Sequence, residues 1–307
     1  MPLGILTRVT LTSREVQAGE FVRQQSRFRG RPEGGPERYH LYVALACPWS
    51  QRAVIARKVL GLDDRLGISY LDPYRDERGW AFSGGRFTDD VNGFSFLREA
   101  YDATVDDYEG RVTVPVLWDK EAGVICCNES ADLMRVFNEW AGGDLYPAEK
   151  RGEIDELNEW IYPELQNGVY RAGFARSQEA YEAAYRGVFA ALPRLEERLA
   201  DRRYLTGDEI TEADWRLFVT LVRFDAVYVG HFKCNLRRIV DYARLSGYLR
   251  DLYQEPGIAD TVDFDHIKRH YYMTHPQLNP TRIVPKGPEL DLWSPHARER
   301  LERRHAA

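Results

Sequence analysis

The first half of the chain alternates between short apolar runs and helical spacing, which predicts a βα arrangement. Residues 38–43, RYHLYV, are typical of a short strand that leads into a turn over 44–48. The next segment places apolar residues on one helix face, at Trp49, Ala53, Ala56 and Leu60. Gly61 suits the position just past the end of that helix. A second strand over 68–71 fits a parallel neighbour, because such a neighbour is reached through a helix.

The middle of the chain is less regular. Residues 72–108 mix Gly, Asp, Arg and aromatic residues without a steady period, so we expect a long functional loop or insertion. Two β-rich runs follow at 112–118 and 124–126, and Pro115 interrupts the first. A proline there indicates either an edge strand or a cis turn at the strand's start, and we favour the cis turn. Capping residues then open a helix with apolar residues at Leu133, Val136, Phe137 and Trp140.

From about residue 151 onward only the helical period remains, and we expect no strand. Two amphipathic helices carry apolar residues at Ile154, Leu157, Ile161 and Leu165, and at Val188, Leu192, Leu195 and Leu199. Thr211–Asp214 form a capping-box variant at the start of an apolar, buried helix, where both side chains can satisfy backbone N–H groups. The stretch 266–288 is rich in His, Tyr and Pro without periodicity, and we expect an ordered extension that wraps over the body.

These patterns predict an α/β plus all-α chain with two domains. The first covers residues 1–150, with an N-terminal extension and an inserted loop, and the second covers residues 151–307, with a C-terminal tail. A length of 307 residues suits two domains.

Composition and charge exclude several function classes. Forty-eight acidic and 42 basic side chains give a net charge of −6, without a basic block that could bind nucleic acid. The chain is 44% hydrophobic but has no apolar run near the roughly 18 residues that a membrane helix needs. The N-terminal apolar patch is broken by Arg8 and lacks the core of a secretory signal, so we expect a cytoplasmic location.

Four cysteines, at positions 47, 126, 127 and 234, form neither a disulfide scaffold nor a paired zinc spacing, so we expect reduced thiols and no metal. Cys47 stands where the first strand feeds the first helix, and Pro48 suits the first helical position. Free N–H groups and the helix dipole at that point favour the thiolate over the thiol, and Arg52 adds to this if its head folds back. The alternative is a small buried hydrophobe. Cys47 is therefore the candidate nucleophile.

The Cys47 site is predicted to be monothiol. Ser50 stands where a thioredoxin-type pair keeps its resolving thiol, so a mixed disulfide at Cys47 must be attacked by a thiol from solution. Adjacent Cys126 and Cys127 point to opposite faces of a strand and are assigned packing roles, and no motif surrounds Cys234.

A second constellation combines Val114-Pro115 with Glu129-Ser130. A cis proline exposes the backbone of Val114 to an extended peptide. Ser130 and free N–H groups at the next helix start can bind a carboxylate, and Glu129 can pair with an ammonium. A ligand with a peptide backbone, an α-amino group and an α-carboxylate matches these groups. The alternative is that Glu129 and Ser130 only cap the helix.

Taken together, these motifs resemble the glutathione transferase superfamily, with a thioredoxin-like domain followed by a helical one. Six segments in order resemble its Xi class, the glutathionyl-hydroquinone reductases: YVALACPWSQRAVIARKVLGL, TVPVLWDK, NESADLMRVFN, NGVYRAGFA, LTGDEITEADWRLFVTLVRFD and NPTRIVPKGP. Ser50 departs from the alanine that is usual there, and its hydroxyl is placed to hydrogen-bond the thiolate.

The resemblance implies roles for individual residues. Cys47 is the catalytic thiol, and the glutathione site is lined by Trp80, Arg111, Val114, Glu129 and Ser130. Arg86 and Arg98 are alternatives to Arg111 for an anionic end. Tyr170 and Tyr271 surround the aromatic substrate, with Tyr272 as a substitute and ordinary packing as the alternative. The family uses glutathione as co-substrate and forms homodimers through the helical domain.

The expected reaction is the glutathione-dependent reduction of glutathionyl-hydroquinones through a mixed disulfide at Cys47. An Omega-like thioltransferase or dehydroascorbate reductase is the nearest alternative, because it shares the single thiol. A conjugating transferase and a non-enzymatic module of the same fold are further alternatives.

Overall fold

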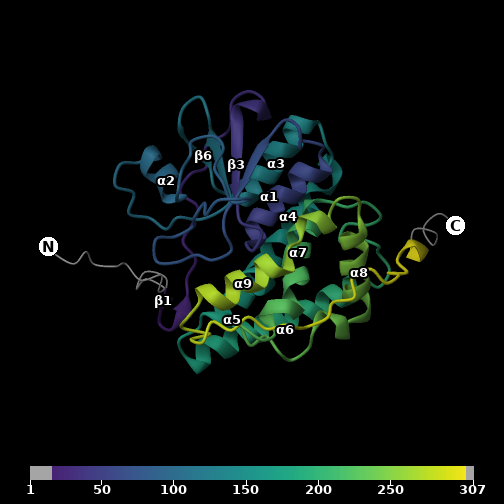
Figure 1. The fold of residues 1–307 in the computed structure, drawn as a ribbon. Helices are drawn as coiled ribbons and strands as arrows, with labels where there is room; N and C mark the ends of the chain where they lie inside the picture. The colour runs from purple at the N-terminus through teal and green to yellow at the C-terminus, as the bar shows by residue number, and fades with distance from the viewer. Residues whose placement is uncertain (1–15, 302–307) are drawn as a thin grey trace. The chain divides into compact units, whose positions relative to one another are not determined.

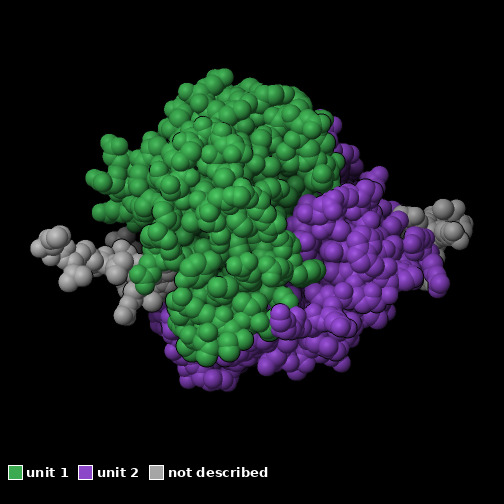
Figure 2. All heavy atoms as spheres, in the orientation of Figure 1, with its two compact units in different colours: residues 1–13, 24–141, 263–285 green, residues 14–23, 142–262, 286–307 purple. Residues whose placement is uncertain are grey.

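A computed structural model of the protein describes residues 16–301, which form two compact units (Figure 2). Unit 1 contains residues 24–141 and 263–285, and unit 2 contains residues 16–23, 142–262 and 286–301. Both units are therefore discontinuous in sequence, whereas the prediction from the sequence is two contiguous domains that meet at residue 150. The first fifteen residues, on which the argument against a secretory signal rests, lie outside the described part.

A four-stranded mixed sheet organises unit 1. Its strands are β3 (Tyr39–Val43), β4 (Gly67–Tyr70), β5 (Val116–Asp119) and β6 (Val124–Cys127), in the order β4-β3-β5-β6. β3 pairs parallel with β4 and antiparallel with β5, and β5 pairs antiparallel with β6. The predicted parallel βα unit is confirmed. The loops that follow β3, β4 and β6 and the segment that precedes β5 therefore all lie at one end of the sheet.

Two helices of unit 1 pack side by side, α1 (Pro48–Val59) and α3 (Ser130–Ala141) (Figure 1). Gly61 follows α1 with a φ of 65°, which is the conformation that a glycine past a helix end adopts at no steric cost. The buried part of α1 is wider than the predicted apolar stripe, since Ser50, Gln51 and Arg52 are also buried. The cis peptide bond at Val114-Pro115 is confirmed.

The segment between β4 and β5 is not a plain loop. It contains α2 (Arg98–Thr104), and its residues Trp80, Leu97, Tyr101 and Tyr108 belong to the hydrophobic core of unit 1. Near the middle of the segment, the Asp89 carboxylate accepts a hydrogen bond of 2.9 Å from the Tyr42 hydroxyl on β3. Of the two alternatives expected for this segment, a loop or an insertion, it is an insertion that contributes to the core.

The expectation for residues 266–288 is also partly wrong, because the stretch begins in a helix, α9 (Phe264–Thr274). Its buried positions are His266, Ile267, His270, Tyr271 and Thr274. They repeat with the helical period, but most of them are His or Tyr, which the apolar pattern does not count. α9 belongs to unit 1, although it follows the helices of unit 2 in the sequence.

Unit 2 is built from helices, as predicted. They are α4 (Arg151–Ile161), α5 (Gly168–Gly173), α6 (Gln178–Arg198), α7 (Glu212–Arg223) and α8 (Ala243–Gln254). Wide π-helical turns follow α4 at Tyr162–Gln166 and α7 at Phe224–Tyr228, and short 3₁₀ turns lie at Ala148–Lys150, Ile239–Asp241 and Ala259–Thr261. A two-stranded hairpin that the apolar pattern does not predict, β1 (Val16–Gln17) with β2 (Glu20–Phe21), completes the unit. In unit 1, a 3₁₀ turn at Pro36–Arg38 precedes β3.

The predicted capping box at the start of α7 is confirmed. The Asp214 carboxylate, fully buried, accepts hydrogen bonds from the Thr211 N–H at 2.8 Å and the Leu205 N–H at 2.8 Å. The hydroxyls of Thr211 and Tyr248 also donate to it, at 3.0 and 2.8 Å. Both halves of the capping box, Thr211 and Asp214, are thus present at the start of α7. Asp214 ties α7 to α8 and to the turn before it.

No helix in residues 16–301 is both long and apolar enough to cross a membrane.

Candidate functional site

The end of the sheet described above brings the candidate residues of unit 1 together. In the order of the strands, Trp80 follows β4, Cys47 follows β3, Val114 precedes β5, and Glu129 and Ser130 follow β6. Neighbouring strands lie about 4.8 Å apart, so the row extends over roughly 14 Å. Three residues of an ordinary extended peptide span roughly 10 Å. The row is therefore long enough to bind an extended peptide of about three residues.

Cys47 occupies the N-cap of α1, at the centre of the row. Its backbone is extended (φ −79°, ψ 121°), its N–H donates to the Ala44 carbonyl at 2.9 Å, and Pro48 takes the first helical position. The side chain is only partly buried and packs against the core cluster that contains Trp80 and Val114. The sulfur therefore lies at the positive end of a helix.

Two neighbours of Cys47 lie differently from what we expected. The Ser50 hydroxyl oxygen, buried in α1, accepts a hydrogen bond from the Ala44 N–H at 3.4 Å instead of contacting the sulfur. The Arg52 guanidinium donates to the Ser130 hydroxyl at 3.4 Å. Arg52 thus joins the start of α1 to the start of α3.

The other three cysteines are poor nucleophiles. Burial raises the pKa of Cys126 to about 11 and the pKa of Cys127 to about 12, and both side chains lie on β6. Burial also raises the pKa of Cys234 in unit 2 to about 12. These values agree with the packing roles predicted for them.

This contrast predicts selective alkylation. With iodoacetamide at pH 8, we expect Cys47 to react at least about tenfold faster than any other cysteine, because a pKa of about 11 leaves roughly one thiol in a thousand ionised. Peptide mass spectrometry over a time course measures the four rates. Equal rates at Cys47 and Cys126 would contradict the assignment of Cys47 as the nucleophile.

The backbone before β5 forms a clamp beside the sulfur. The Cys47 thiol donates to the Val114 carbonyl at 3.6 Å. The Tyr101 hydroxyl holds both backbone groups of Thr113, since it donates to the carbonyl at 2.8 Å and accepts from the N–H at 3.1 Å. In the described part of the chain the Val114 N–H has no hydrogen-bond partner, so it can bind a peptide carbonyl.

Glu129 and Ser130 lie at the start of α3. One oxygen of the Glu129 carboxylate accepts a hydrogen bond from the Ala131 N–H at 3.1 Å, so the residue does cap its helix, and the other accepts from the Ser26 hydroxyl at 2.9 Å. The preceding Asn128 is linked to the clamp, because its side-chain amide donates to the Tyr101 hydroxyl at 3.0 Å. Capping and ligand binding are compatible, since a carboxylate has about four acceptor positions.

Trp80 is 4% exposed and is held from two directions. Its carbonyl accepts from the Leu97 N–H at 2.9 Å, and its ring stacks on His270 of α9, with centroids 4.8 Å apart and planes 13° apart. His270 in turn donates through Nδ1 to the Pro73 carbonyl at 2.8 Å. α9 therefore fixes the orientation of the predicted wall of the glutathione site.

Three arginines, Arg111, Arg86 and Arg98, are candidates to bind an anionic end of glutathione, and their surroundings differ. The Arg111 backbone N–H donates to the Gln24 side chain at 3.2 Å, next to the clamp. Arg86 pairs with Asp263 at 2.7 Å, and Arg98 donates to the Tyr108 carbonyl at 2.9 Å. Arg86 and Arg98 are thus engaged with protein groups, and Arg111 also interacts with the protein.

The two predicted tyrosines lie in different units. Tyr271, 1% exposed, is on α9 in unit 1, where its ring packs against His270 and His275 with centroid distances of 5.5 and 5.9 Å. Tyr170, 7% exposed, is on α5 in unit 2, with the Arg23 guanidinium 4.7 Å from its ring centroid. Contact of either tyrosine with an aromatic substrate stays a prediction.

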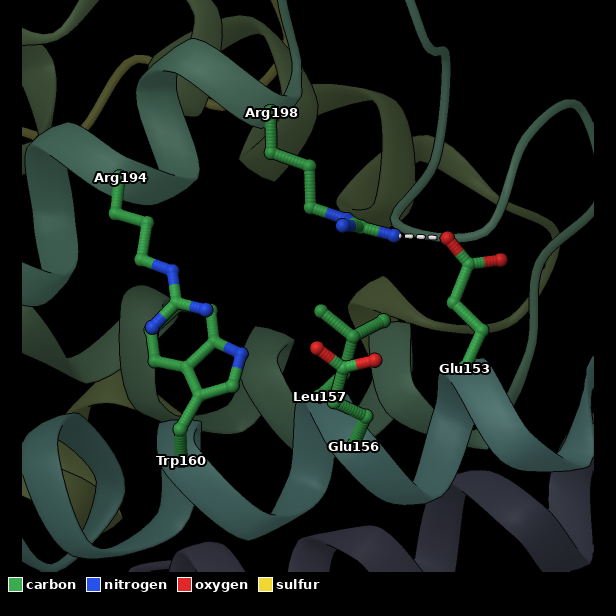
Figure 3. A pocket seen from close by; sticks show the side chains of 6 residues that line it. All are labelled: Glu153, Glu156, Leu157, Trp160, Arg194 and Arg198. Atoms are coloured by element: carbon green, nitrogen blue, oxygen red, sulfur yellow. Dashed lines mark hydrogen bonds and ion pairs between the residues drawn. The ribbon is translucent and has the colours of Figure 1, made fainter.

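A cavity of about 110 Å³ in unit 2 offers no comparable chemistry (Figure 3). Arg198 pairs with Glu153 at its edge, and the Arg194 guanidinium lies 3.9 Å from the centroid of the Trp160 ring. The residues that line this cavity include no thiol or hydroxyl.

Reasoning from the sequence misses the residues that hold the site in place: Ser26, Tyr101, Thr113, Asn128 and His270. Each acts on a partner far along the chain, such as Ser26 on Glu129 across 103 positions. Asn128, the first residue of NES, has the only local signal, its place just before the start of a helix.

The sequence matches two families, described as the N-terminal domain of glutathione S-transferase over residues 46–140 and its C-terminal domain over residues 178–251. It is 49% identical to the glutathionyl-hydroquinone reductase YqjG of Escherichia coli, over 92% of this chain and 93% of that protein. It is 48% identical to the glutathionyl-hydroquinone reductase PcpF of Sphingobium chlorophenolicum, over 89% and 91%.

Solved structures give the same assignment. The glutathione-bound structure of YqjG from Escherichia coli superposes with a TM-score of 0.84 at 51% identity, over 86% of this chain and 89% of that one. The Xi glutathione transferase of Phanerochaete chrysosporium superposes with a TM-score of 0.85 at 46% identity, over 90% and 95%. With its thioredoxin-like and helical domains, its cysteine at the start of α1 and these relatives, the chain belongs to the glutathionyl-hydroquinone reductases, the Xi class of the glutathione transferase superfamily.

Proposed function

We propose that the protein reduces glutathionyl-hydroquinones to hydroquinones, with glutathione as the reductant and Cys47 as the nucleophile. The observation that carries this proposal is a partly exposed thiol at the start of a helix, beside a free peptide clamp, with serine at the position of a resolving cysteine. Two relatives of nearly half identity are named for this activity.

In the first step the Cys47 thiolate attacks the sulfur of the glutathionyl-hydroquinone. The bond between that sulfur and the aromatic carbon breaks, its electrons stay with the carbon, and the carbon takes up a proton. A disulfide forms between Cys47 and glutathione. The hydroquinone leaves, reduced by two electrons, while the two sulfurs are oxidised.

In the second step a glutathione thiolate from solution attacks the glutathione sulfur of the mixed disulfide. Oxidised glutathione leaves and the Cys47 thiolate is restored. Ser50 cannot perform this attack, and the thiols of Cys126, Cys127 and Cys234 stay protonated at neutral pH. The second thiol must therefore come from a second substrate molecule.

The glutathionyl part fits the row of residues across the sheet end. The Val114 backbone pairs with the cysteinyl residue, as in the addition of a strand. The γ-glutamyl end reaches α3, where Glu129 binds the ammonium and the helix start with Ser130 binds the α-carboxylate. Trp80 forms a wall against the peptide.

Tyrosine hydroxyls are assigned to the aromatic part. Tyr271 and Tyr170 hydrogen-bond the phenolic oxygens and assist proton delivery to the carbon that loses sulfur. Arg111 contributes positive charge at an anionic end of the substrate. The homodimer and the cytoplasmic location that the sequence predicts belong to the same proposal, and light scattering on the purified protein tests the first.

Ser26 provides a prediction about the γ-glutamyl end. Replacing Ser26 by Ala removes one of the two hydrogen bonds that hold the Glu129 carboxylate in position. We expect this to reduce the binding free energy of glutathione by about 1–2 kcal/mol. We expect KM for glutathione to rise roughly 5- to 30-fold, with little change in kcat.

Steady-state kinetics measures this effect, and Ser246→Ala on α8 is the matched control. The Ser246 hydroxyl makes no hydrogen bond within residues 16–301, so this variant should match the wild type. If both variants show the wild-type KM, Ser26 does not position Glu129.

Mass spectrometry tests the reaction directly. After incubation of the intact protein with glutathionyl-menadiol, we expect one glutathione per chain, on the peptide that carries Cys47. Addition of glutathione should remove the adduct and release oxidised glutathione. No adduct at Cys47 would refute the proposal.

Assays on three substrates separate this function from its rivals. A glutathionyl-hydroquinone should be turned over faster than a glutathione mixed disulfide or dehydroascorbate, which an Omega-like enzyme prefers. Rapid conjugation of chlorodinitrobenzene would instead indicate a conjugating transferase.

A further inference from the structure

We propose that Arg75 binds the glycine carboxylate of glutathione. This inference rests on the proposed function, because it takes the glutathionyl group as the ligand. Arg75 lies in the segment after β4, five residues before Trp80, and its guanidinium carbon is 5.3 Å from the centroid of the Trp80 ring. The resemblance assigns no role to Arg75.

Arg75 is a cation without a carboxylate partner in residues 16–301. Its Nε is buried without a hydrogen-bond partner, and the guanidinium forms no ion pair with any carboxylate in residues 16–301. Burial lowers the pKa of Arg75 to about 10, and the charge of Cys47 opposes this shift. A guanidinium with that pKa is still charged at neutral pH. An unpaired, largely buried charge is costly unless a ligand supplies the opposite charge.

The neighbouring arginines of the same segment do not share this property. Arg78 pairs with Asp76 at 2.6 Å, and Arg86 pairs with Asp263 at 2.7 Å. Arg98 pairs with Asp102 at 3.3 Å and also donates to the Tyr108 carbonyl. Of the four arginines in residues 72–98, only Arg75 has no hydrogen-bond acceptor within the described part of the chain. It is therefore the one that is prepared for an external anion.

The strand order decides which anion Arg75 meets. α3 follows β6 at one edge of the sheet, and the segment with Arg75 follows β4 at the opposite edge. The cysteinyl residue of the peptide lies beside Val114 and Cys47, which flank the two middle strands, β5 and β3. The γ-glutamyl end of the peptide lies at α3. Its other end then points toward β4. That end carries the glycine carboxylate, which a guanidinium binds through two parallel hydrogen bonds.

Calorimetry with two ligands tests the assignment without relying on turnover. The full-length protein is titrated with glutathione and with its glycine monoethyl ester, in which an uncharged ethyl ester replaces the carboxylate in question. We expect the wild type to bind glutathione roughly tenfold more tightly than the ester. Arg75→Gln should bind both ligands equally and weakly, and Arg75→Lys should recover part of the preference.

Arg78→Gln is the matched control, since Arg78 is close in sequence but paired with Asp76, and it should keep the wild-type preference. Equal binding of the two ligands by the wild type would overturn the proposal, even if Arg75→Gln failed to fold. Loss of the preference in Arg111→Gln but not in Arg75→Gln would assign the carboxylate to Arg111 instead. Neither result would affect the Cys47 adduct, so failure here is distinguishable from failure of the proposed function.

Discussion

Replacement of Cys47 by alanine is expected to lower turnover of glutathionyl-hydroquinones by at least about 10³-fold, because the covalent step has no other nucleophile. The binding of glutathione should change little, since the side chain of Cys47 is small and the clamp is backbone. The measurement is kcat with glutathionyl-menadiol, together with the affinity for glutathione by calorimetry.

Cys126→Ala is the control for this experiment. It removes a thiol from the same unit, on β6, whose pKa burial raises to about 11. We expect its activity to equal that of the wild type. If Cys47→Ala kept more than about a tenth of the wild-type activity, Cys47 would not be the nucleophile.

Replacement of Asp214 by alanine is expected to have the largest effect on stability. The substitution leaves four donors without their acceptor in the interior of unit 2, including the N–H groups of Leu205 and Thr211 and the hydroxyl of Tyr248. We expect a loss of about 3–5 kcal/mol in the free energy of unfolding. Urea unfolding followed by circular dichroism measures it.

Asp208→Ala provides the comparison for Asp214. Asp208 is an exposed residue in the turn before α7 and makes no hydrogen bond in the described structure. Its replacement should change the unfolding free energy by less than about 0.5 kcal/mol. A loss below about 1 kcal/mol in Asp214→Ala would mean that the buried carboxylate contributes little beyond its own desolvation cost.

Local signals in the sequence are sufficient for the centre of the site. Pro48 after Cys47 marks the helix start, Gly61 marks its end, and Pro115 marks the cis turn, and each acts through its own backbone conformation. The parallel pairing of β3 with β4 also follows, because a helix between two strands favours a parallel pair.

Long-range contacts explain what the sequence does not reveal. α2 has seven residues and buries only Ala100 and Tyr101, too few to display a period. α9 buries His and Tyr where a pattern search expects aliphatic residues. Arg75 has no local motif at all, and its position becomes informative only when the pairing of its neighbours is known.

The return of α9 to unit 1 has a consequence for recombination between related genes. The His270 ring that supports Trp80 is encoded 190 codons downstream of it, beyond the long central segment of unit 2, residues 142–262. A single crossover near residue 141 would pair Trp80 with a foreign His270 region. Chimeras should therefore inherit both segments from one parent, and an exchange of residues 142–262 alone requires two junctions.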